Sequence, residues 1–263
     1  MTALAHSAMP AQVGLLAGRA IRRVLRSPAQ MVFPLLFPLI LLAVNASGLD
    51  AATDLPGFPA ASYLDFALAI PFMQGALFAA LNGGQDLARD IEGGFLDRLA
   101  MTPLSGAALL AGQLGGALFM GLVSAVLYLV VGVAFGVGIV TGVAGALVLL
   151  ALSLVISMAF ACFGTFVALR AGSGEAVQGF FPLFFVLLFL SSAFFPRDLI
   201  EQEWFRTIAT YNPVSYMVEG IRSLVIAGWD GQALAQAFGI ALIATVAFLA
   251  LSARALRTRL VRT

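Results

Sequence analysis

The sequence predicts an all-helical integral membrane protein with six transmembrane helices. Of its 263 residues, 61% are hydrophobic and only 10% are charged, whereas a soluble domain carries about 25% charged residues. Apolar runs close to or above the roughly 20 residues that a membrane helix requires cover most of the chain. The net charge of +1 offers no basic face for nucleic acid. These observations favour one transmembrane domain over residues 1–263.

Six apolar runs are the candidate transmembrane helices. They cover residues 30–47, 63–84, 104–135, 143–169, 176–195 and 233–252. The first run is short and holds Pro34 and Pro38, which a membrane helix tolerates where neighbouring helices satisfy the freed carbonyl groups. A signal peptide is the alternative for this run, because Val44-Asn45-Ala46 resembles a cleavage site, but the leader before it is longer than usual.

Glycines punctuate the predicted helices. The glycine-rich stretch 136–142 predicts a tight turn between the third and fourth runs. Pairs at GxxxG spacing, such as Gly112/Gly116 and Gly132/Gly136, are typical of close helix packing in membranes. With 27 glycines in the chain, chance matches to this spacing are expected.

The arginines predict the orientation of the chain. All 14 basic residues are arginine. Eleven of them lie near the two termini, between the second and third runs, or after the fourth run, and this excess places those segments and both termini in the cytoplasm. The other three, Arg197, Arg206 and Arg222, lie between the fifth and sixth runs. The predicted location is the cell (inner or plasma) membrane, with multiple passes.

Residues 12–26 predict a helix that lies along the membrane surface. Apolar residues recur at helical spacing from Val13 to Leu25. Four arginines occupy the opposite face: Arg19, Arg22, Arg23 and Arg26. Such a helix lies in the plane of the lipid headgroups, where each arginine gains about 1 kcal/mol from anionic lipid. The alternative is that these arginines only set the orientation of the first run.

Residues 85–105 predict a short helix that docks on another protein. Six charged residues fall between Asp86 and Arg98, and Gly93-Gly94 interrupts any continuous helix. An apolar patch follows, made by Phe95, Leu96 and Leu99. Thr102-Pro103 is a start signal for the third run. The alternative is a solvated loop.

Residues 196–229 predict two short helices that are too charged to span a membrane. Asp198 and Glu201 fit a capping box at the start of the first helix. The second begins at Asn212-Pro213 and ends at Gly228.

These two helices predict a hairpin that enters the outer leaflet. Charged residues at membrane depth require partners, and Glu219 with Arg222, at i and i+3, is the expected ion pair. The alternative is an amphipathic pair of helices lying on the outer surface.

Three motifs of the chain are DIEGGFLDRLAMTPLS (residues 90–105), FLSSAFFPRDLI (189–200) and YNPVSYMVEGIRSL (211–224). The first resembles the segment between spans 2 and 3 of the type-2 ABC exporter permeases, and the other two resemble the C-terminal part of that family. The resemblance is closest to its daunorubicin-resistance-type members. The amphipathic start, the six runs and the hairpin match in order. Two positions depart from the family pattern, since Gly94-Phe95 replaces Gly-Thr and Ile91 stands where a charge is common.

The resemblance implies a permease homodimer in which each copy docks one separate ATPase subunit. The residues that it implies for coupling to the ATPase are Arg89, Asp90, Glu92, Gly94, Phe95, Leu96, Asp97, Arg98 and Leu99. Those that it implies for the outer gate and re-entrant hairpin are Phe194, Phe195, Pro196, Asn212, Pro213, Glu219 and Arg222. ATP and Mg²⁺ would bind to the partner subunit. The composition agrees with a separate ATPase subunit, because a chain without lysine cannot bind ATP through a P-loop.

The expected function is ATP-driven export of a hydrophobic or amphipathic molecule, such as a drug or a lipid, without enzymatic activity, cofactor or metal in this chain. Polysaccharide or lipid-linked glycan export is an alternative, but sugar paths offer Tyr and Trp faces, and here 22 Phe stand against four Tyr and two Trp. A second alternative function is ion-driven secondary transport, for which broken helices with a charge near the membrane midplane are expected. The third to sixth runs hold no such charge.

Overall fold

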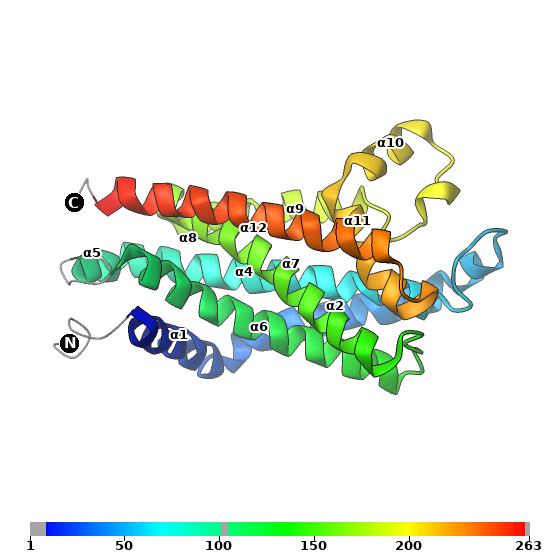
Figure 1. Cartoon of the computed structure of the whole chain (residues 1–263), viewed down its shortest axis with the longest axis horizontal. Coiled ribbons are helices and arrows are strands. Elements are labelled where there is room, and N and C mark those ends of the chain that lie inside the picture. Colours follow the sequence, from blue (N-terminus) through cyan, green and yellow to red (C-terminus); the bar gives the residue numbers. More distant parts are fainter. Residues whose placement is uncertain (1–8, 101–104, 261–263) are drawn as a thin grey trace.

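The computed structural model describes residues 9–100 and 105–260, apart from the side chains of residues 29, 30, 97, 99, 100 and 260, and all its regular elements are helical. The long helices are α2 (Pro28–Gly48), α4 (Ala69–Glu92), α6 (Gly106–Ala134), α7 (Gly142–Ala171) and α12 (Gly231–Leu260). They form an elongated bundle in which α7 crosses diagonally between α6 and α12 (Figure 1). Shorter helices are α1 (Met9–Leu25), α3 (Tyr63–Ala67), α5 (Phe95–Ala100), α8 (Gly174–Gly179), α9 (Phe181–Phe189), α10 (Glu203–Tyr211) and α11 (Pro213–Arg222).

The bundle has two distinct ends. The start of α1, the helix α5 and the end of α12 lie together at one end, called here the α5 end (Figure 1). The helices α10 and α11 lie towards the other, called here the hairpin end. Segments that the arginine pattern predicts to be cytoplasmic lie at the α5 end, and this orientation stays a prediction.

Within the described residues, five helices are long and apolar enough to cross a membrane: Met31–Gly48, Tyr63–Glu92, Gly106–Ala134, Gly142–Ala171 and Gly231–Arg259. The run predicted at 176–195 forms instead the shorter pair α8 and α9, Gly174–Phe189. Pro182 lies in the first turn of α9, where it begins a helix and cannot continue the preceding one. Five of the six predicted spans are therefore long apolar helices, and the remaining one, the fifth along the chain, is interrupted.

The carbonyl that Pro38 frees inside α2 is satisfied by a neighbouring helix, as predicted for this run. Pro38 has no N–H, so the carbonyl of Pro34 lacks its helical partner. The Tyr128 hydroxyl on α6 donates to this carbonyl at 2.8 Å, and the Tyr128 side chain is fully buried. The freed carbonyl is thus satisfied within the protein rather than left in the apolar interior.

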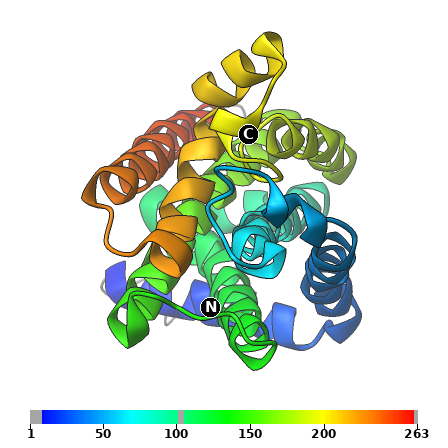
Figure 2. The same ribbon diagram turned by 90° about the vertical axis from the view of Figure 1, so that its right-hand side faces the viewer.

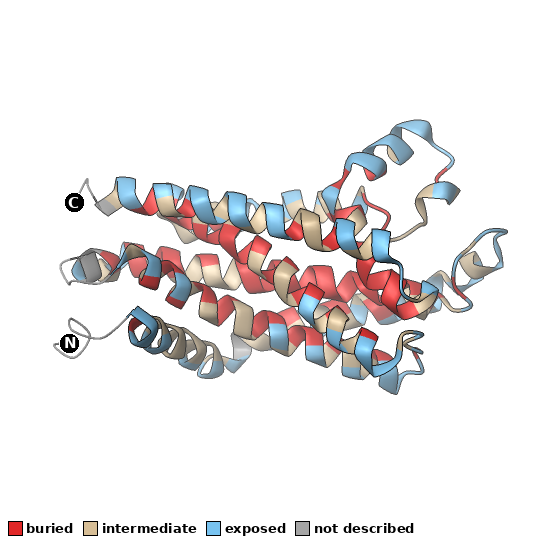
Figure 3. Ribbon diagram, viewed as in Figure 1, coloured by how far each residue is buried: buried red, intermediate tan, exposed pale blue. Residues whose placement is uncertain are grey.

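The helix α4 forms the centre of the bundle and is buried along most of its length (Figure 3). It packs most closely on α7 where small residues face each other. A Cβ atom added to Gly164 of α7 would lie 2.6 Å from the carbonyl oxygen of Ala80, and one added to Gly84 of α4 would lie 3.1 Å from the carbonyl oxygen of Gly164. The backbones of α4 and α7 therefore touch, a contact that small residues make possible in membrane helices.

We expect Gly164→Ala to destabilise the protein by about 1–3 kcal/mol, because the added methyl group meets rigid backbone and the helices have to separate. Gly239→Ala on α12 is the matched control, since a Cβ atom there has no neighbour within 4 Å. The thermal unfolding midpoint in detergent should fall for the first variant and stay level or rise for the second. Equal midpoints would contradict the close contact.

The predicted surface helix exists as α1 and crosses the bundle obliquely, as the view along the bundle shows (Figure 2). It packs on glycines of α6, because Cβ atoms added to Gly112 and Gly116 would lie 2.3 and 2.9 Å from the side chains of Leu16 and Ala20. One of the two GxxxG pairs therefore marks a real contact, between α6 and the surface helix. Part of the apolar face of α1 is covered by protein, while Leu15 and Leu25 remain exposed.

The capping box predicted at Asp198 and Glu201 is wrong. Residues Arg197–Leu199 form a single 3₁₀ turn, Ile200 is extended and buried, and α10 begins only at Glu203. Burial of Ile200 draws the chain into the core and interrupts the helix. The predicted start of the second helix is confirmed, because the Asn212 side chain accepts a hydrogen bond from the N–H of Val214.

Candidate functional site

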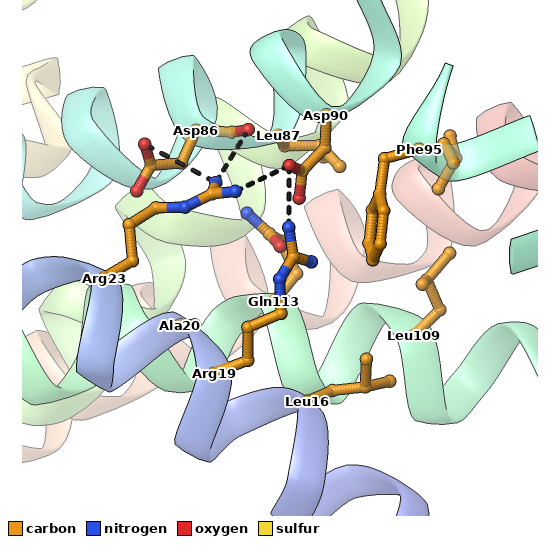
Figure 4. Close-up of a pocket in the computed structure, with 11 residues that line it drawn as sticks. Leu16, Arg19, Ala20, Arg23, Asp86, Leu87, Asp90, Phe95, Leu109 and Gln113 are labelled. Atoms are coloured by element: carbon orange, nitrogen blue, oxygen red, sulfur yellow. Dashed lines mark hydrogen bonds and ion pairs between the residues drawn. The ribbon is translucent and has the colours of Figure 1, made fainter. Parts of the chain in front are cut away.

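A cluster of charges joins α1 to α4 at the α5 end (Figure 4). One oxygen of Asp90 accepts hydrogen bonds from Arg19 at 3.0 Å and from Arg23 at 2.8 Å. Arg23 also lies 3.7 Å from the carboxylate of Asp86, which in turn pairs with Arg89 at 3.4 Å. The Asp90 side chain is 9% exposed, so its charge is largely withdrawn from water and balanced by two arginines.

The cluster favours the charged form of Arg23. Partial burial lowers the pKa of Arg23, but the hydrogen bond and charge of Asp90, together with the charge of Asp86, raise it above its ordinary value. Two of the four arginines predicted to meet lipid are thus engaged by α4, while Arg22 and Arg26 are exposed. A predicted coupling residue, Asp90, is likewise a structural partner of α1.

The short helix α5 is attached to the bundle through two side chains. Leu96 is 2% exposed and packs in an apolar cluster with Leu87 and Ile91 of α4. The guanidinium of Arg19 lies 3.8 Å from the centre of the Phe95 ring, a cation–π contact. The cavity between α1, α4 and α5 has a volume of about 30 Å³. It is far too small for a substrate, so this region is a joint between helices.

Other predicted coupling residues face outward around this joint. The Glu92 side chain is exposed and accepts a hydrogen bond from the N–H of Gly174, the first residue of α8, at 3.1 Å. Arg98 donates to the carbonyl of Gly93 at 3.1 Å, and Gly94 has a φ of 64°, which lets α5 turn away from α4. The side chains of Asp97 and Leu99 and the predicted start signal Thr102-Pro103 lie outside the described part of the chain.

At the hairpin end, Arg222 is buried and binds backbone carbonyls. It is 8% exposed and donates to the carbonyls of Phe66, Ser192 and Ala193 at 3.2, 3.1 and 2.9 Å. Its guanidinium also lies 3.5 Å from the centre of the Phe66 ring. One side chain thus connects α11 with α3 and with the turn after α9.

The predicted ion pair between Glu219 and Arg222 is wrong. Glu219 pairs instead with Arg197, and the Arg197 guanidinium lies 4.7 Å from the centre of the Tyr216 ring. Burial lowers the pKa of Arg197, whereas the charge of Glu219 and the hydrogen bonds raise it, with a net rise. The i, i+3 spacing failed as a guide because the Arg222 guanidinium binds three backbone carbonyls and Glu219 meets Arg197.

The remaining gate residues lie around the same turn. The Asn212 amide donates to the carbonyls of Leu187 and Leu190, which closes the end of α9. The Phe194 ring stacks on Phe189 at 4.9 Å, and the Phe194 carbonyl accepts from the Tyr63 hydroxyl at 2.9 Å. Phe195 and Pro196 continue the turn and are half-buried, and Pro213 is exposed at the start of α11.

Three residues of these two sites were not predicted: Asp86, Arg197 and Tyr63. Asp86 was recognised only as a charge in the segment, although it lies four residues before Asp90 on the same helix face. Arg197 directly follows Pro196 but lies 22 residues before Glu219, so no local spacing in the sequence pairs the two. Nothing local indicates that Tyr63 would reach Phe194, 131 residues later.

A comparison with protein families matches residues 11–226 to the family model described as ABC-2 type transporter. The match begins in the first turn of α1, continues past the end of α11 and includes both candidate sites. A comparison with curated proteins finds no match to the chain.

Proposed function

Because the chain belongs to the ABC-2 type transporter family and is thereby the permease component of an ABC transporter, we propose that it exports a hydrophobic or amphipathic molecule from the cytoplasm, powered by a separate ATPase subunit. In this proposal the chain is a daunorubicin-resistance-type permease with six crossings, counting α8–α9 as the fifth. Both termini face the cytoplasm, and ATP and Mg²⁺ bind only to the partner subunit.

The observation that carries this proposal is the combination of anchored and exposed residues around α5. Phe95 and Leu96 attach α5 to the bundle, while Arg89, Glu92 and Arg98 are exposed beside it. A helix with a buried anchor and a charged outer surface suits a partner that pushes or pulls on it. We assign this surface to the ATPase.

The structure offers a route for that movement. The segment α3–α4 runs from Tyr63 to Glu92 through the centre of the bundle. At one end it carries Asp90 and the joint to α5, and at the other the Phe66 carbonyl binds Arg222 of the hairpin. A displacement of α5 would thus reach the proposed outer gate through one nearly continuous helix.

An apolar substrate is favoured by a run of phenylalanine rings along α2, α4 and α9. Neighbouring centroids lie 4.8–6.4 Å apart among Phe33, Phe37, Phe78, Phe181, Phe185, Phe189 and Phe194. Phe33 and Phe189 are 58% and 54% exposed, so this face is open to a second permease copy and to a substrate between the copies. Glycan export would call for Tyr and Trp faces, and this run consists of phenylalanine alone.

We expect Glu92→Arg to abolish retention of the ATPase subunit and ATP-dependent export, because it reverses a charge at the centre of the proposed docking surface. Glu92→Gln keeps an oxygen acceptor for the Gly174 N–H and should retain the ATPase partly. The measurement is co-purification of the tagged permease with its ATPase subunit, and then export of a lipophilic dye from vesicles that hold both proteins.

Glu203→Arg is the matched control, since Glu203 is an exposed glutamate at the hairpin end. It should leave retention unchanged. Full retention and transport in Glu92→Arg would exclude this surface as the coupling site. A large drop in the unfolding midpoint of Glu92→Arg would assign the loss to the α4–α8 contact rather than to docking.

A further inference from the structure

An apolar groove lies on the bundle at the α5 end, away from the phenylalanine run. It has a volume of about 620 Å³ and is formed by α6, α7 and α12 with the start of α1. Small residues such as Ala107, Ala111 and Ala253 line it together with leucines and Met158. This volume lies within the range of small-molecule sites.

The groove exists because α12 is attached to α7 and diverges from α6. The Ser252 hydroxyl donates to the Cys162 carbonyl at 3.1 Å, and Arg259 donates to the Leu169 carbonyl at 3.2 Å. Towards α6, the Leu256 side chain comes within 3.4 Å of the Cβ position of Gly106. These contacts hold α12 in place against α7 and α6, and so they fix the sides of the groove.

Arg257 is the one charged residue among those that line the groove. It is exposed, and no ion pair or hydrogen bond holds its guanidinium within the described residues. An apolar groove with a free cation at its end complements a molecule that has an apolar chain and an anionic head.

The dimensions fit a single lipid leaflet. Leu249 and Arg257 both line the groove and lie eight residues apart on α12, about 12 Å at the rise of an α-helix. Gly106 and Leu118 bound it on α6, about 18 Å apart by the same rise. Half of a hydrocarbon core is about 15 Å, so an acyl chain whose phosphate met Arg257 would extend along the whole groove.

We propose that this groove binds an anionic phospholipid of the leaflet at the α5 end, with one acyl chain between α6 and α12 and the phosphate on Arg257. The lipid is a resident ligand on the outside of the bundle. It bridges the start of α6 to the end of α12, so its binding supports the α5 end whichever molecule the protein transports.

Native mass spectrometry of the full-length protein tests this site, with the protein extracted from bilayers of phosphatidylglycerol and phosphatidylethanolamine. We expect the wild type to retain phosphatidylglycerol preferentially. Arg257→Gln should lower this preference about fivefold, the effect of one interfacial arginine. Arg254→Gln is the matched control, because Arg254 is exposed on the same helix and does not line the groove.

A second variant tests the apolar part. Ala111→Trp fills the groove from an exposed position on α6 and should reduce retention of both lipids at an unchanged unfolding midpoint. Equal retention of the two lipids by the wild type would overturn the proposal, as would equal losses in Arg257→Gln and Arg254→Gln. Because none of these measurements uses transport or the ATPase, they are independent of the proposed export function.

Discussion

Arg222→Met is expected to lower the stability of the protein by at least about 3 kcal/mol, because it leaves three buried carbonyls without donors. Those of Phe66, Ser192 and Ala193 each accept from Arg222, and an unsatisfied buried acceptor costs about 1–3 kcal/mol. Methionine keeps the apolar bulk of the side chain and fills irregular space. For a chain of this size the loss corresponds to a fall of about 6–12 °C in the unfolding midpoint.

The measurement is thermal unfolding in detergent. Unfolding is monitored through tryptophan fluorescence or through the fraction of protein that stays monodisperse. Arg222→Lys keeps the charge, but a single ammonium group cannot match the three directions of the guanidinium, so its midpoint should lie between those of the methionine variant and the wild type. Arg206→Met removes an exposed arginine of α10 and should change little. A midpoint for Arg222→Met equal to that of Arg206→Met would show that the buried guanidinium does not hold the hairpin.

Local pattern predicted the helices of this chain well. The apolar spacing from Val13 to Leu25 and the 104–135 run both became helices near their expected bounds, while the 233–252 run became a helix that continues to Leu260. The break at Gly93-Gly94 and the start at Asn212-Pro213 also appeared where expected. These features depend on neighbours in sequence, namely periodicity, a flexible glycine and a capping side chain, so no knowledge of the tertiary structure was needed.

Contacts between segments far apart in the chain could not be predicted from the sequence. Arg222 was assigned to Glu219, three residues earlier, yet it binds carbonyls that are 29 to 156 residues away. Arg19 and Asp90, 71 residues apart, were assigned to lipid and to the ATPase, and they bind each other. In an apolar interior a charged side chain takes the nearest available partner in space, and that partner is known only once the helices are packed.

The second large effect is expected for Leu96→Asp, which should release α5 from the bundle and abolish export. Leu96 lies in an apolar cluster with Leu87, Ile91 and Leu256, where an unpaired carboxylate costs several kcal/mol. A helix of six residues has little stability of its own, so detaching α5 is cheaper than unfolding the bundle. The unfolding midpoint should therefore change only slightly, while the amides of α5 lose their protection.

Hydrogen–deuterium exchange of α5, measured beside ATP-dependent transport, separates anchoring from docking. We expect Leu96→Asp to exchange α5 amides at least tenfold faster and to transport nothing, and Leu96→Met to resemble the wild type, because methionine keeps the volume and polarity of the anchor. Glu92→Arg should lose transport with protected α5 amides, since Glu92 is exposed. If Leu96→Asp lost transport with α5 still protected, Leu96 would have to act on the partner directly, which its burial at 2% exposure argues against.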